Sequence, residues 1–364
     1  MHPDLKYQIA LTMVPTIGPV SQKKLLEHFV NAKDIFKANK KELCQIEGIG
    51  EWSANKIIAW NDFKRVDEEI NFIEKHSIKP LFIFNNEYPQ RLINCHDAPI
   101  LLYYKGNASL NEERIISIIG TRTNSSYGKM ITERIVEQLP ANTLIISGLA
   151  FGIDAIAHKA ALRNHQNTIG VLAHGLDDLY PSLHRSLAND MINHGGLLTE
   201  FNLNTQPDKY NFPRRNRIVA GMADATIVIE TATKGGSMIT ADLAFHYNRE
   251  LFAVPGKLND PKSSGCLKLI QENKAILFSN TEHLLETLNW KTKKDPITKQ
   301  AELFKTLSKE EQTIIEILQN QSTFSMDELL IKTGYNSSKM ASIVLNLELL
   351  DIIQTIPGKK IALV

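Results

Sequence analysis

Apolar and polar positions alternate with two different periods along the chain. Over the first ninety residues, apolar positions recur at helical spacing in stretches separated by Pro and Gly. Two of these stretches, Pro15 to Phe29 and Ile46 to Trp60, each place an Ile-Gly turn before an amphipathic helix, 32 residues apart. The pattern predicts a helical domain over residues 1–79 with two helix-hairpin-helix units. Glycines of such hairpins can offer backbone N–H groups to a phosphate. The same pattern fits equally well a small helical module that only packs and binds no ligand.

From Leu81 onward the pattern changes to short apolar runs that alternate with helical segments. Continuous apolar strands separated by helices are typical of a parallel sheet covered on both faces. We therefore predict a doubly wound α/β domain over residues 80–290, with a mostly parallel sheet. The expected strands are Leu81 to Phe84, Ile100 to Tyr104, Ile115 to Ile119, Leu144 to Ile146, Thr168 to Leu172, Leu197 to Glu200, Ala225 to Glu230 and Leu251 to Val254.

The last part of the chain predicts a linker and a third domain. Residues 291–300 are polar and basic, as in a linker, and residues 301–364 hold three amphipathic stretches before a possible hairpin at Pro357-Gly358. Three helices followed by a hairpin predict a winged helix. Its candidate recognition helix offers Lys339 but also Glu348 and no Arg, which disfavours DNA reading. The stretches are Lys309 to Asn320, Ser325 to Thr333 and Ser337 to Leu350.

Composition narrows the class of protein. The 364 residues are 43% apolar and 22% charged, which excludes global disorder. No window reaches the roughly 18 apolar residues of a membrane span, and the start shows no secretory signal, so we expect a cytoplasmic protein without membrane contact. Cys44, Cys95 and Cys266 are odd in number and far apart, which disfavours a disulfide framework or a zinc site and predicts buried, reduced thiols.

Net charge gives no support to nucleic-acid binding. Lys and Arg number 12 against 12 Asp and Glu over residues 1–90, 19 against 19 over 91–290, and 10 against 9 over 291–364. Any such function must therefore rest on local clusters. We expect these at the carboxyl ends of the strands, where helix N-termini converge in open α/β sheets.

The first such cluster is Gly120-Thr121-Arg122. The distance from Gly120 to Gly128 does not fit the G-x-G-x-x-G spacing, so conventional NAD binding is disfavoured. An arginine in a glycine-lined cleft suits forked contacts with phosphate or stacking on a base. A structural salt bridge is the alternative for Arg122.

The second cluster begins at Ser147-Gly148, where small residues leave a strand before a helix. Asp154 and His158 lie four residues apart on one face of that helix, which could suggest a catalytic pair. We favour a structural role, with Asp154 as an N-cap and His158 as a satisfied polar contact.

Two further clusters follow along the chain. Arg214, Arg215 and Arg217 form the densest arginine cluster, beside Phe212 and Asn216, and such a surface can follow a phosphodiester backbone while bases stack. Any one of these arginines could instead brace a buried glutamate, Glu200 or Glu230. The turn before the next helix, Gly235-Gly236-Ser237, offers N–H groups and a hydroxyl to a phosphate.

Together these clusters resemble the DNA-processing protein A family, also called DprA or Smf. The matching segments are GTR at 120–122, SGLAFGID at 147–154, the GLDDLYP run at 175–181, FPRRNRI at 212–218 and GGSMIT at 235–240, in the family's order. The helical N-terminal module and the C-terminal winged helix also match, so the resemblance spans nearly the whole chain.

The resemblance implies a protein that protects incoming single-stranded DNA and loads the RecA recombinase onto it during natural transformation. It implies an extended Rossmann-like fold that forms a homodimer and holds DNA, not a cofactor, in a positive pocket. Ser182 stands where relatives often have a basic residue, so His184 or Arg185 would supply that charge. The implied DNA-binding residues are Gly120, Thr121, Arg122, Ser147, Gly148, Tyr180, His184, Arg185, Phe212, Arg214, Arg215, Asn216, Arg217, Gly236 and Ser237.

We expect binding without chemistry, because no nucleophile or carboxylate pair has a plausible general base nearby and no residues show metal-ligand spacing. The main alternative is an enzyme similar to the lysine-decarboxylase-like phosphoribohydrolases. Their PGGxGTxxE pattern is absent, since Lys234 precedes Gly235-Gly236 and no Glu follows in register. A second alternative is an interaction scaffold with a vestigial pocket.

Overall fold

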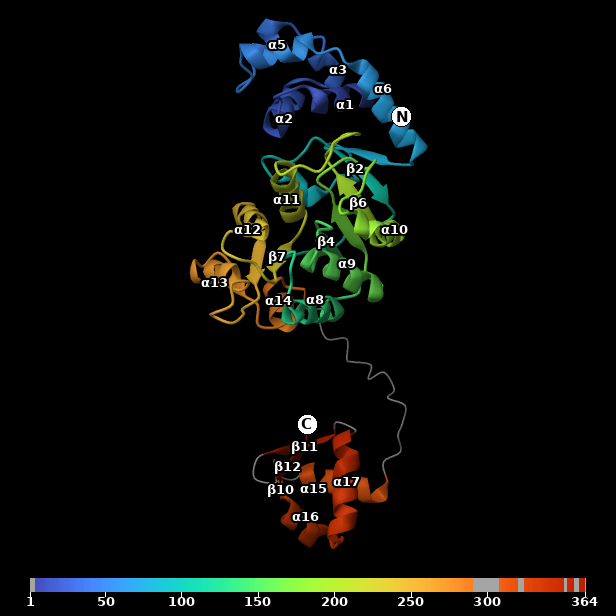
Figure 1. The fold of residues 1–364 in the computed structure, drawn as a ribbon, viewed down its shortest axis with the longest axis vertical. Helices are drawn as coiled ribbons and strands as arrows, with labels where there is room; N and C mark the ends of the chain where they lie inside the picture. Colours follow the sequence, from blue (N-terminus) through green and yellow to red (C-terminus); the bar gives the residue numbers. More distant parts are fainter. Residues whose placement is uncertain (1–3, 291–307, 320–323, 350–351, 357–359, 364) are drawn as a thin grey trace. The chain divides into compact units, whose positions relative to one another are not determined.

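The computed structural model describes residues 4–290, 308–319, 324–349, 352–356 and 360–363. The chain divides into two compact units, residues 1–291 and residues 292–364, shown in Figure 1. The expected linker 291–300 and the expected turn at Pro357-Gly358 lie outside the described residues.

The first unit opens with a helical module in which the two predicted hairpins are present. Gly18 and Gly50 are the N-caps of the second helix of each hairpin, and Gly48 has a φ of 85°, a value that glycine adopts without strain. The apolar faces of the module merge with the core of the α/β domain. The helices are α1 (Leu5–Met13), α2 (Pro19–His28), α3 (Ala32–Ile35), α4 (Lys40–Cys44), α5 (Glu51–Ala59) and α6 (Phe63–Lys75).

A nine-stranded sheet follows, in the order β1-β2-β6-β5-β4-β3-β7-β8-β9. The pairs β1–β2 and β2–β6 are antiparallel and the others are parallel, which confirms the mostly parallel α/β prediction. Strand β9 was not predicted, because two residues are too short to show a period. The strands are β1 (Lys79–Phe82), β2 (Leu101–Gly106), β3 (Arg114–Ile119), β4 (Thr143–Ser147), β5 (Thr168–Val171), β6 (Gly195–Thr199), β7 (Ala225–Val228), β8 (Glu250–Ala253) and β9 (Ile276–Leu277).

Helices cover both faces of this sheet. Ile116 and Ile118 of β3 belong to one core and Ile115 and Ile119 to another, because successive side chains of a strand point to opposite faces. One core is completed by α8 (Ser126–Gln138), α9 (Ile153–Arg163) and α14 (Thr281–Thr287), and the other by α11 (Asn211–Gly221), α12 (Gly236–His246) and α13 (Ser264–Gln271).

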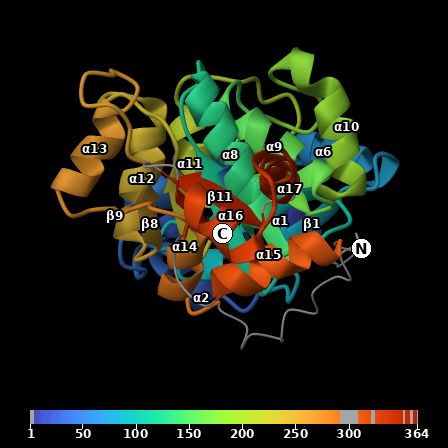
Figure 2. The same cartoon turned by 90° about the horizontal axis from the view of Figure 1, so that it is seen from below.

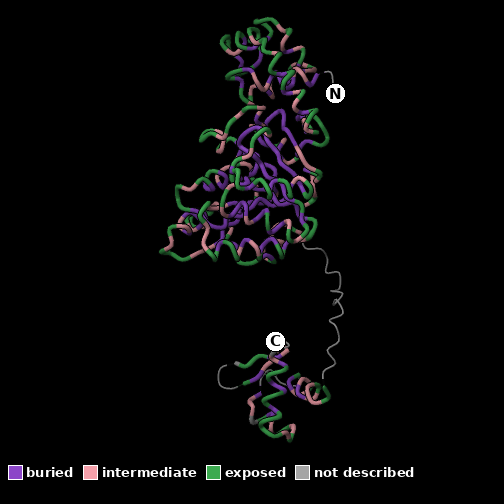
Figure 3. Tube along the Cα trace, turned by 45° about the vertical axis from the view of Figure 1, so that its right-hand side comes forward, coloured by how far each residue is buried: buried purple, intermediate pink, exposed green. Residues whose placement is uncertain are grey.

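The figures show how these layers are arranged. In Figure 2, α12 and α13 lie beside β8 and β9, whereas α10 (Arg185–Asn193) lies toward the other edge of the sheet. The short helix α7 (Gln90–Ile93) and the single turn at Ser182–His184 complete the unit. In Figure 3, buried residues follow the strands through the interior.

The strand order reverses direction at β3. From β3 the chain builds outward through β4, β5 and β6, and then returns to the other side of β3 to form β7 and β8. At such a switch point the neighbouring connections diverge and leave a crevice at the carboxyl ends of the strands. In this fold, the crevice lies at the ends of β3, β4 and β7.

The second unit is a winged helix, as predicted. Ser325 caps α16 through a hydrogen bond from Glu328 N, and Gly334 ends that helix with a φ of 69°. The helices are α15 (Lys309–Gln319), α16 (Met326–Thr333) and α17 (Ser337–Leu349), and a sheet of order β10-β12-β11 is formed by β10 (Phe324–Ser325), β11 (Ile353–Ile356) and β12 (Lys360–Leu363).

One expectation about the cysteines was wrong. Cys95 and Cys266 are buried free thiols, but Cys44 is exposed. Cys44 ends the short helix α4, in which Leu43 takes the buried position. Among the described residues, no helix combines the length and apolar character that crossing a bilayer requires.

Candidate functional site

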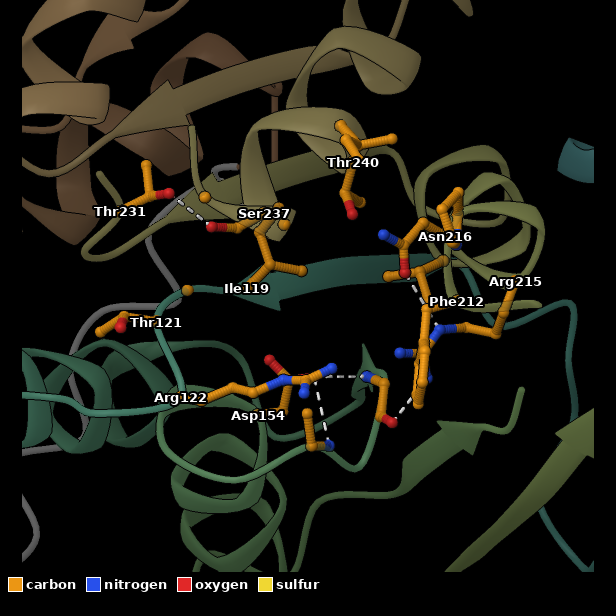
Figure 4. Close-up of a pocket in the computed structure, with 18 of the residues that line it drawn as sticks. Ile119, Thr121, Arg122, Asp154, Phe212, Arg215, Asn216, Thr231, Ser237 and Thr240 are labelled. Carbon is orange, nitrogen blue, oxygen red and sulfur yellow. Dashed lines mark hydrogen bonds between the residues drawn. The ribbon is translucent and has the colours of Figure 1, made fainter. Parts of the chain in front are cut away.

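A cavity of about 390 Å³ lies at the carboxyl ends of β3, β4 and β7, where the sheet has its switch point (Figure 4). It is lined by the ends of these strands and by the N-terminal parts of α11 and α12. The segments predicted to carry function therefore meet at one place. The lining residues are Ile119, Gly120, Thr121, Arg122, Gly148, Ala150, Asp154, Lys209, Phe212, Pro213, Arg215, Asn216, Val219, Thr231, Ala232, Gly235, Gly236, Ser237, Ile239 and Thr240.

Arg122 reaches into this space from the loop after β3 (Figure 4). Its guanidinium carbon lies 5.1 Å from the centroid of the Phe212 ring, a cation–π contact between two segments far apart in sequence. The Phe212 ring in turn lies 6.0 Å from the ring of Tyr180, which is 43% exposed. The Arg122 guanidinium and two aromatic rings, tilted by 58° to each other, thus lie beside the cavity; Arg122 and Tyr180 are exposed and Phe212 is half-buried.

Glu230 fixes the loop that carries Arg122. The backbone N–H of Thr121 donates to the Glu230 carbonyl at 2.7 Å, and the N–H of Ser125 donates to its carboxylate at 2.9 Å. Ser125 is also the N-cap of α8. The loop is therefore pinned on both sides of Arg122, while the Arg122 side chain stays exposed.

The N-terminus of α12 contributes donors to the cavity wall. Its N-cap is Gly235, which supplies no side-chain cap, and a Cβ at Gly236 would find open space. The first N–H groups of a helix lack intrahelical partners and carry partial positive charge. The Ser237 hydroxyl donates to Thr231 Oγ1 at 2.7 Å (Figure 4). This wall suits an anion.

Arg215 forms the floor of the cavity. It is 4% exposed, and its Nη1 donates to the carbonyl oxygens of Gly148, at 2.5 Å, and Val171. A Cβ at position 148 would lie 2.5 Å from the guanidinium carbon, so a larger residue there would have to displace the Arg215 side chain. Burial lowers the pKa of Arg215 to about 10, which leaves it cationic at neutral pH.

Asp154 lies in the same floor, but not as the predicted N-cap. The N-cap of α9 is Gly152, with a φ of 77°, and Asp154 is the second helical residue. Its carboxylate accepts from the N–H groups of Gly148, at 3.1 Å, and Ala150, at 3.4 Å. Burial raises the pKa of Asp154, and the nearby Arg215 opposes that shift.

His158 is a polar residue of the core. The Thr168 hydroxyl donates to the Ile145 carbonyl at 3.0 Å, so Nδ1 of His158, 2.6 Å away, donates to that hydroxyl. Burial lowers the pKa of His158 to about 3, which keeps the ring neutral. The Nδ1 contact fits a structural role, but Nε2 is buried without a hydrogen-bond partner among the described residues, so the expected satisfied contact is met at one nitrogen only.

Two predicted arginines lie outside the lining. Arg217 is 6% exposed and donates to a carboxylate oxygen of Glu200 and to the Asp97 carbonyl, which realises the glutamate-bracing alternative. Arg214 is exposed, with its Nη2 3.6 Å from the same Glu200 oxygen and its guanidinium 4.9 Å from the Phe201 ring. Of the three arginines, only Arg215 lines the cavity.

Four other predicted residues are also absent from the lining. Ser147 is buried, and its hydroxyl donates to the Ile118 carbonyl at 2.6 Å. His184 is buried, with Nδ1 2.9 Å from the Leu149 carbonyl, whereas Arg185 is exposed at the start of α10. Tyr180 approaches the cavity only through Phe212.

The structure also adds residues that sequence reasoning missed. Lys209 lines the cavity from the loop between β6 and α11, and Thr240 lines it from α12. Lys209 stands three residues before Phe212, but an irregular loop gives no period that would orient its side chain. Thr231 was visible as the first residue of the polar turn after β7, without a reason to single it out.

The exposed charges of the cavity are positive. Arg122 and Lys209 are exposed, and the ion pairs of the described residues include neither of them. Asp154 is the acidic residue among those that line the cavity, and it is buried. Within the described ranges, no group of three His, Cys, Asp or Glu could hold a metal ion. The arrangement suits an extended anion that also carries flat rings.

Comparisons with known proteins agree with this architecture. The family model of DNA recombination-mediator protein A matches residues 79–289, which is more than half of the chain. A model of a SAM-like helix-hairpin-helix tandem matches residues 9–59, and a model of a DprA winged helix domain matches residues 299–359.

Individual relatives give the same result. Protein Smf from Synechocystis is 35% identical over 76% of this chain and 71% of its own length, and DNA processing protein DprA from Streptococcus pneumoniae is 40% identical over 56% and 72%. The crystal structure of the pneumococcal protein has a TM-score of 0.67 at 31% identity, covering 77% of this chain and 97% of the other. A structure describing the single-stranded DNA binding mode of DNA processing protein A from Helicobacter pylori has a TM-score of 0.53 at 31% identity, covering 58% and 96%.

Proposed function

Because the chain belongs to the DNA recombination-mediator protein A family, also called DprA or Smf, we propose that it binds single-stranded DNA in the cavity at the switch point. One observation carries the proposal: the exposed Arg122 guanidinium lies over the Phe212 ring beside the uncapped N-terminus of α12. A phosphate and an unpaired base need these two kinds of partner next to each other. The H. pylori relative, described as binding single-stranded DNA, supports the ligand class.

The residues divide into two groups by what they offer. Arg122 and Lys209 attract phosphates, the amides at Gly236 and Ser237 donate to them, and Phe212 and Tyr180 offer faces for base stacking. Arg215, Arg217 and Ser147 are buried, and each donates hydrogen bonds to other groups of the protein. We therefore assign DNA contact to the first group and support to the second.

We propose binding without chemical conversion. Asp154, the carboxylate of the cavity, accepts two backbone N–H groups, and the Ser237 hydroxyl is hydrogen-bonded to Thr231. Neither stands as an activated base or nucleophile. Incubation with nucleoside monophosphates tests the phosphoribohydrolase alternative: we expect no free base, and its release would favour an enzyme.

We further infer the cellular role that the family resemblance implies. The protein, as a homodimer, protects incoming single-stranded DNA and loads RecA onto it. A nuclease-protection assay and a RecA loading assay on strands coated with single-strand-binding protein test these roles separately. If the protein does not protect the strand from nuclease, or does not load RecA, the corresponding role is wrong, and the DNA-binding proposal is unaffected.

Fluorescence anisotropy with labelled oligo(dT) and a matched duplex tests the DNA-binding proposal. We expect a clear preference for the single strand. If roughly three to five phosphates are contacted, log K should fall against log salt with a slope of about −2 to −3.5. Absence of oligo(dT) binding at low salt would overturn the proposal and favour the interaction scaffold.

A further inference from the structure

A buried carboxylate joins the helical module to the α/β domain. Helix α6 buries Val66, Glu69 and Ile73 along one face, so Glu69 occupies a position where the pattern calls for an apolar side chain. Glu69 is 3% exposed. Burying a carboxylate is costly unless it gains a partner, and Glu69 Oε2 accepts from the backbone N–H of Leu203 at 2.8 Å.

Leu203 belongs to the loop between β6 and α11. This loop contains no helix or strand over residues 201–210, so its course depends on individual contacts rather than on a regular hydrogen-bond ladder. Its first residues are held from several directions. Besides Glu69, the anchors are the hydrogen bonds from Tyr103 Oη to Asn202 Oδ1 at 2.8 Å, from Asn202 Nδ2 to Thr12 Oγ1 at 3.5 Å, and from Asn204 N to the Asp177 carboxylate at 3.2 Å.

The far end of the same loop reaches the cavity. Lys209 lines the cavity, and Phe212 of the first turn of α11 supports Arg122. A shift of the loop near Leu203 would therefore be passed along the chain to both groups. Two of the anchors, Thr12 and Glu69, come from the helical module, which itself contributes no residue to the cavity lining.

We propose that Glu69 is a positioning residue for DNA binding. By holding Leu203, it sets the course of the loop and with it the places of Lys209 and Phe212 at the cavity. The helical module then shapes the DNA site without touching DNA. This inference rests on the proposed function.

Two substitutions at Glu69 test the proposal in the full-length protein. Glu69→Leu keeps the size of the side chain but removes the acceptor, whereas Glu69→Gln keeps an amide oxygen that can accept from Leu203 N–H. We expect oligo(dT) affinity to fall roughly 3- to 10-fold in Glu69→Leu and to stay within about 2-fold in Glu69→Gln, because a lost partner of a buried donor is costly and a replaced one is not.

Matched controls separate positioning from general destabilisation. Val66→Ala weakens the same buried face of α6 but leaves the Glu69–Leu203 hydrogen bond in place, and Glu68→Leu makes the same chemical change at the exposed neighbouring position. Both should bind oligo(dT) like the wild type. Equal loss of affinity in Val66→Ala and Glu69→Leu would overturn the proposal, since instability alone would then explain the loss.

Amide hydrogen exchange in the absence of DNA makes the result independent of the proposed function. We expect faster exchange over residues 201–210 in Glu69→Leu and unchanged exchange in Glu69→Gln. If the wild type binds no oligo(dT), the proposed function fails; if it binds and Glu69→Leu binds equally well, only the positioning role fails.

A variant in the α/β domain covers the case in which Glu69→Leu does not fold. Tyr103→Phe removes only the hydroxyl that holds Asn202, at the same end of the loop. We expect faster exchange over residues 201–210 and an affinity loss of about 2- to 5-fold. Unchanged exchange and affinity in Tyr103→Phe would show that this end of the loop does not control the site, which would overturn the proposal.

Discussion

Buried and exposed positions around the cavity use the same kinds of side chain for different purposes. The exposed rim that carries Arg122 and Lys209 is called the mouth of the cavity. Behind the cavity surface, Arg215 in the floor donates to two carbonyl oxygens, and Arg217, outside the lining, pairs with Glu200; both arginines are buried. At the mouth, Arg122 and Lys209 are exposed and have no partner among the ion pairs of the described residues. A buried cation must be satisfied by the protein, whereas an exposed one can meet a ligand. Arginine density in a motif therefore does not by itself identify contact residues.

The largest effect should come from the buried Arg217–Glu200 pair. Arg217→Ala leaves Glu200 buried without its closest cation, and breaking a buried pair in this way costs about 3–5 kcal/mol. We expect the free energy of unfolding in urea to fall by about that amount. Arg214→Ala, an exposed substitution one turn away, is the control and should cost less than about 1 kcal/mol. Equal losses for the two variants would contradict the division between buried and exposed arginines.

The next largest effect concerns Glu69, a buried carboxyl group that accepts from a backbone N–H, whereas Glu200 accepts from an arginine. Burial raises the pKa of Glu69 from 4.5 to about 7. The charge of Asp177 also raises this pKa, whereas the hydrogen bond from the Leu203 N–H and the charge of Arg65 lower it. The Tyr103 hydroxyl faces the carboxyl group as well. Between these two pH values the folded state holds a proton that the unfolded state has lost. The contribution of Glu69 to stability is therefore lost as pH rises from about 4.5 to above 7.

Urea titrations of the wild type and Glu69→Gln at pH 5 and pH 8 test this. The wild type should lose on the order of 3 kcal/mol relative to the variant between the two conditions. The variant itself serves as the control, because other titrating groups affect both proteins. Parallel stability curves would contradict a raised pKa for Glu69.

A smaller effect, on affinity rather than stability, should come from the mouth. Arg122→Ala should weaken oligo(dT) binding roughly 10-fold, because a charge-assisted contact and a stacking surface are both lost. The melting temperature should stay unchanged, since the side chain is exposed. The oligo(dT) affinity of Arg122→Lys should lie between those of the wild type and Arg122→Ala, because lysine keeps the charge without the flat guanidinium. A drop in melting temperature would place Arg122 in the floor instead.

The smallest effect is expected outside the cavity. Arg185→Ala, at the exposed start of α10, should change oligo(dT) affinity by less than about 2-fold, as one surface charge away from the site contributes little beyond screening. A gel-shift titration at low salt measures it. A 10-fold loss would mean that the bound strand extends from the mouth along α10.

Local information was enough for much of this protein. The change of period at Leu81 separates the helical module from the α/β domain, and apolar runs locate eight of the strands, because burial on both faces leaves a mark in every strand. Glycines in turns likewise mark Gly120, Gly148 and Gly236, which all line the cavity; at Gly120 and Gly148 neighbouring groups leave little room for a Cβ, whereas a Cβ at Gly236 would find open space. Motifs of this kind also carried the family resemblance.

Tertiary structure decided what each charged residue does. Arg214, Arg215 and Arg217 lie within four positions, yet one is exposed, one forms the cavity floor and one braces Glu200, because a helix turns about 100° per residue and only its packing says which face is inside. The sequence pattern did not identify Lys209 or Glu69 for a related reason. Their positions depend on contacts between segments that are far apart in the sequence, and no local period records such contacts.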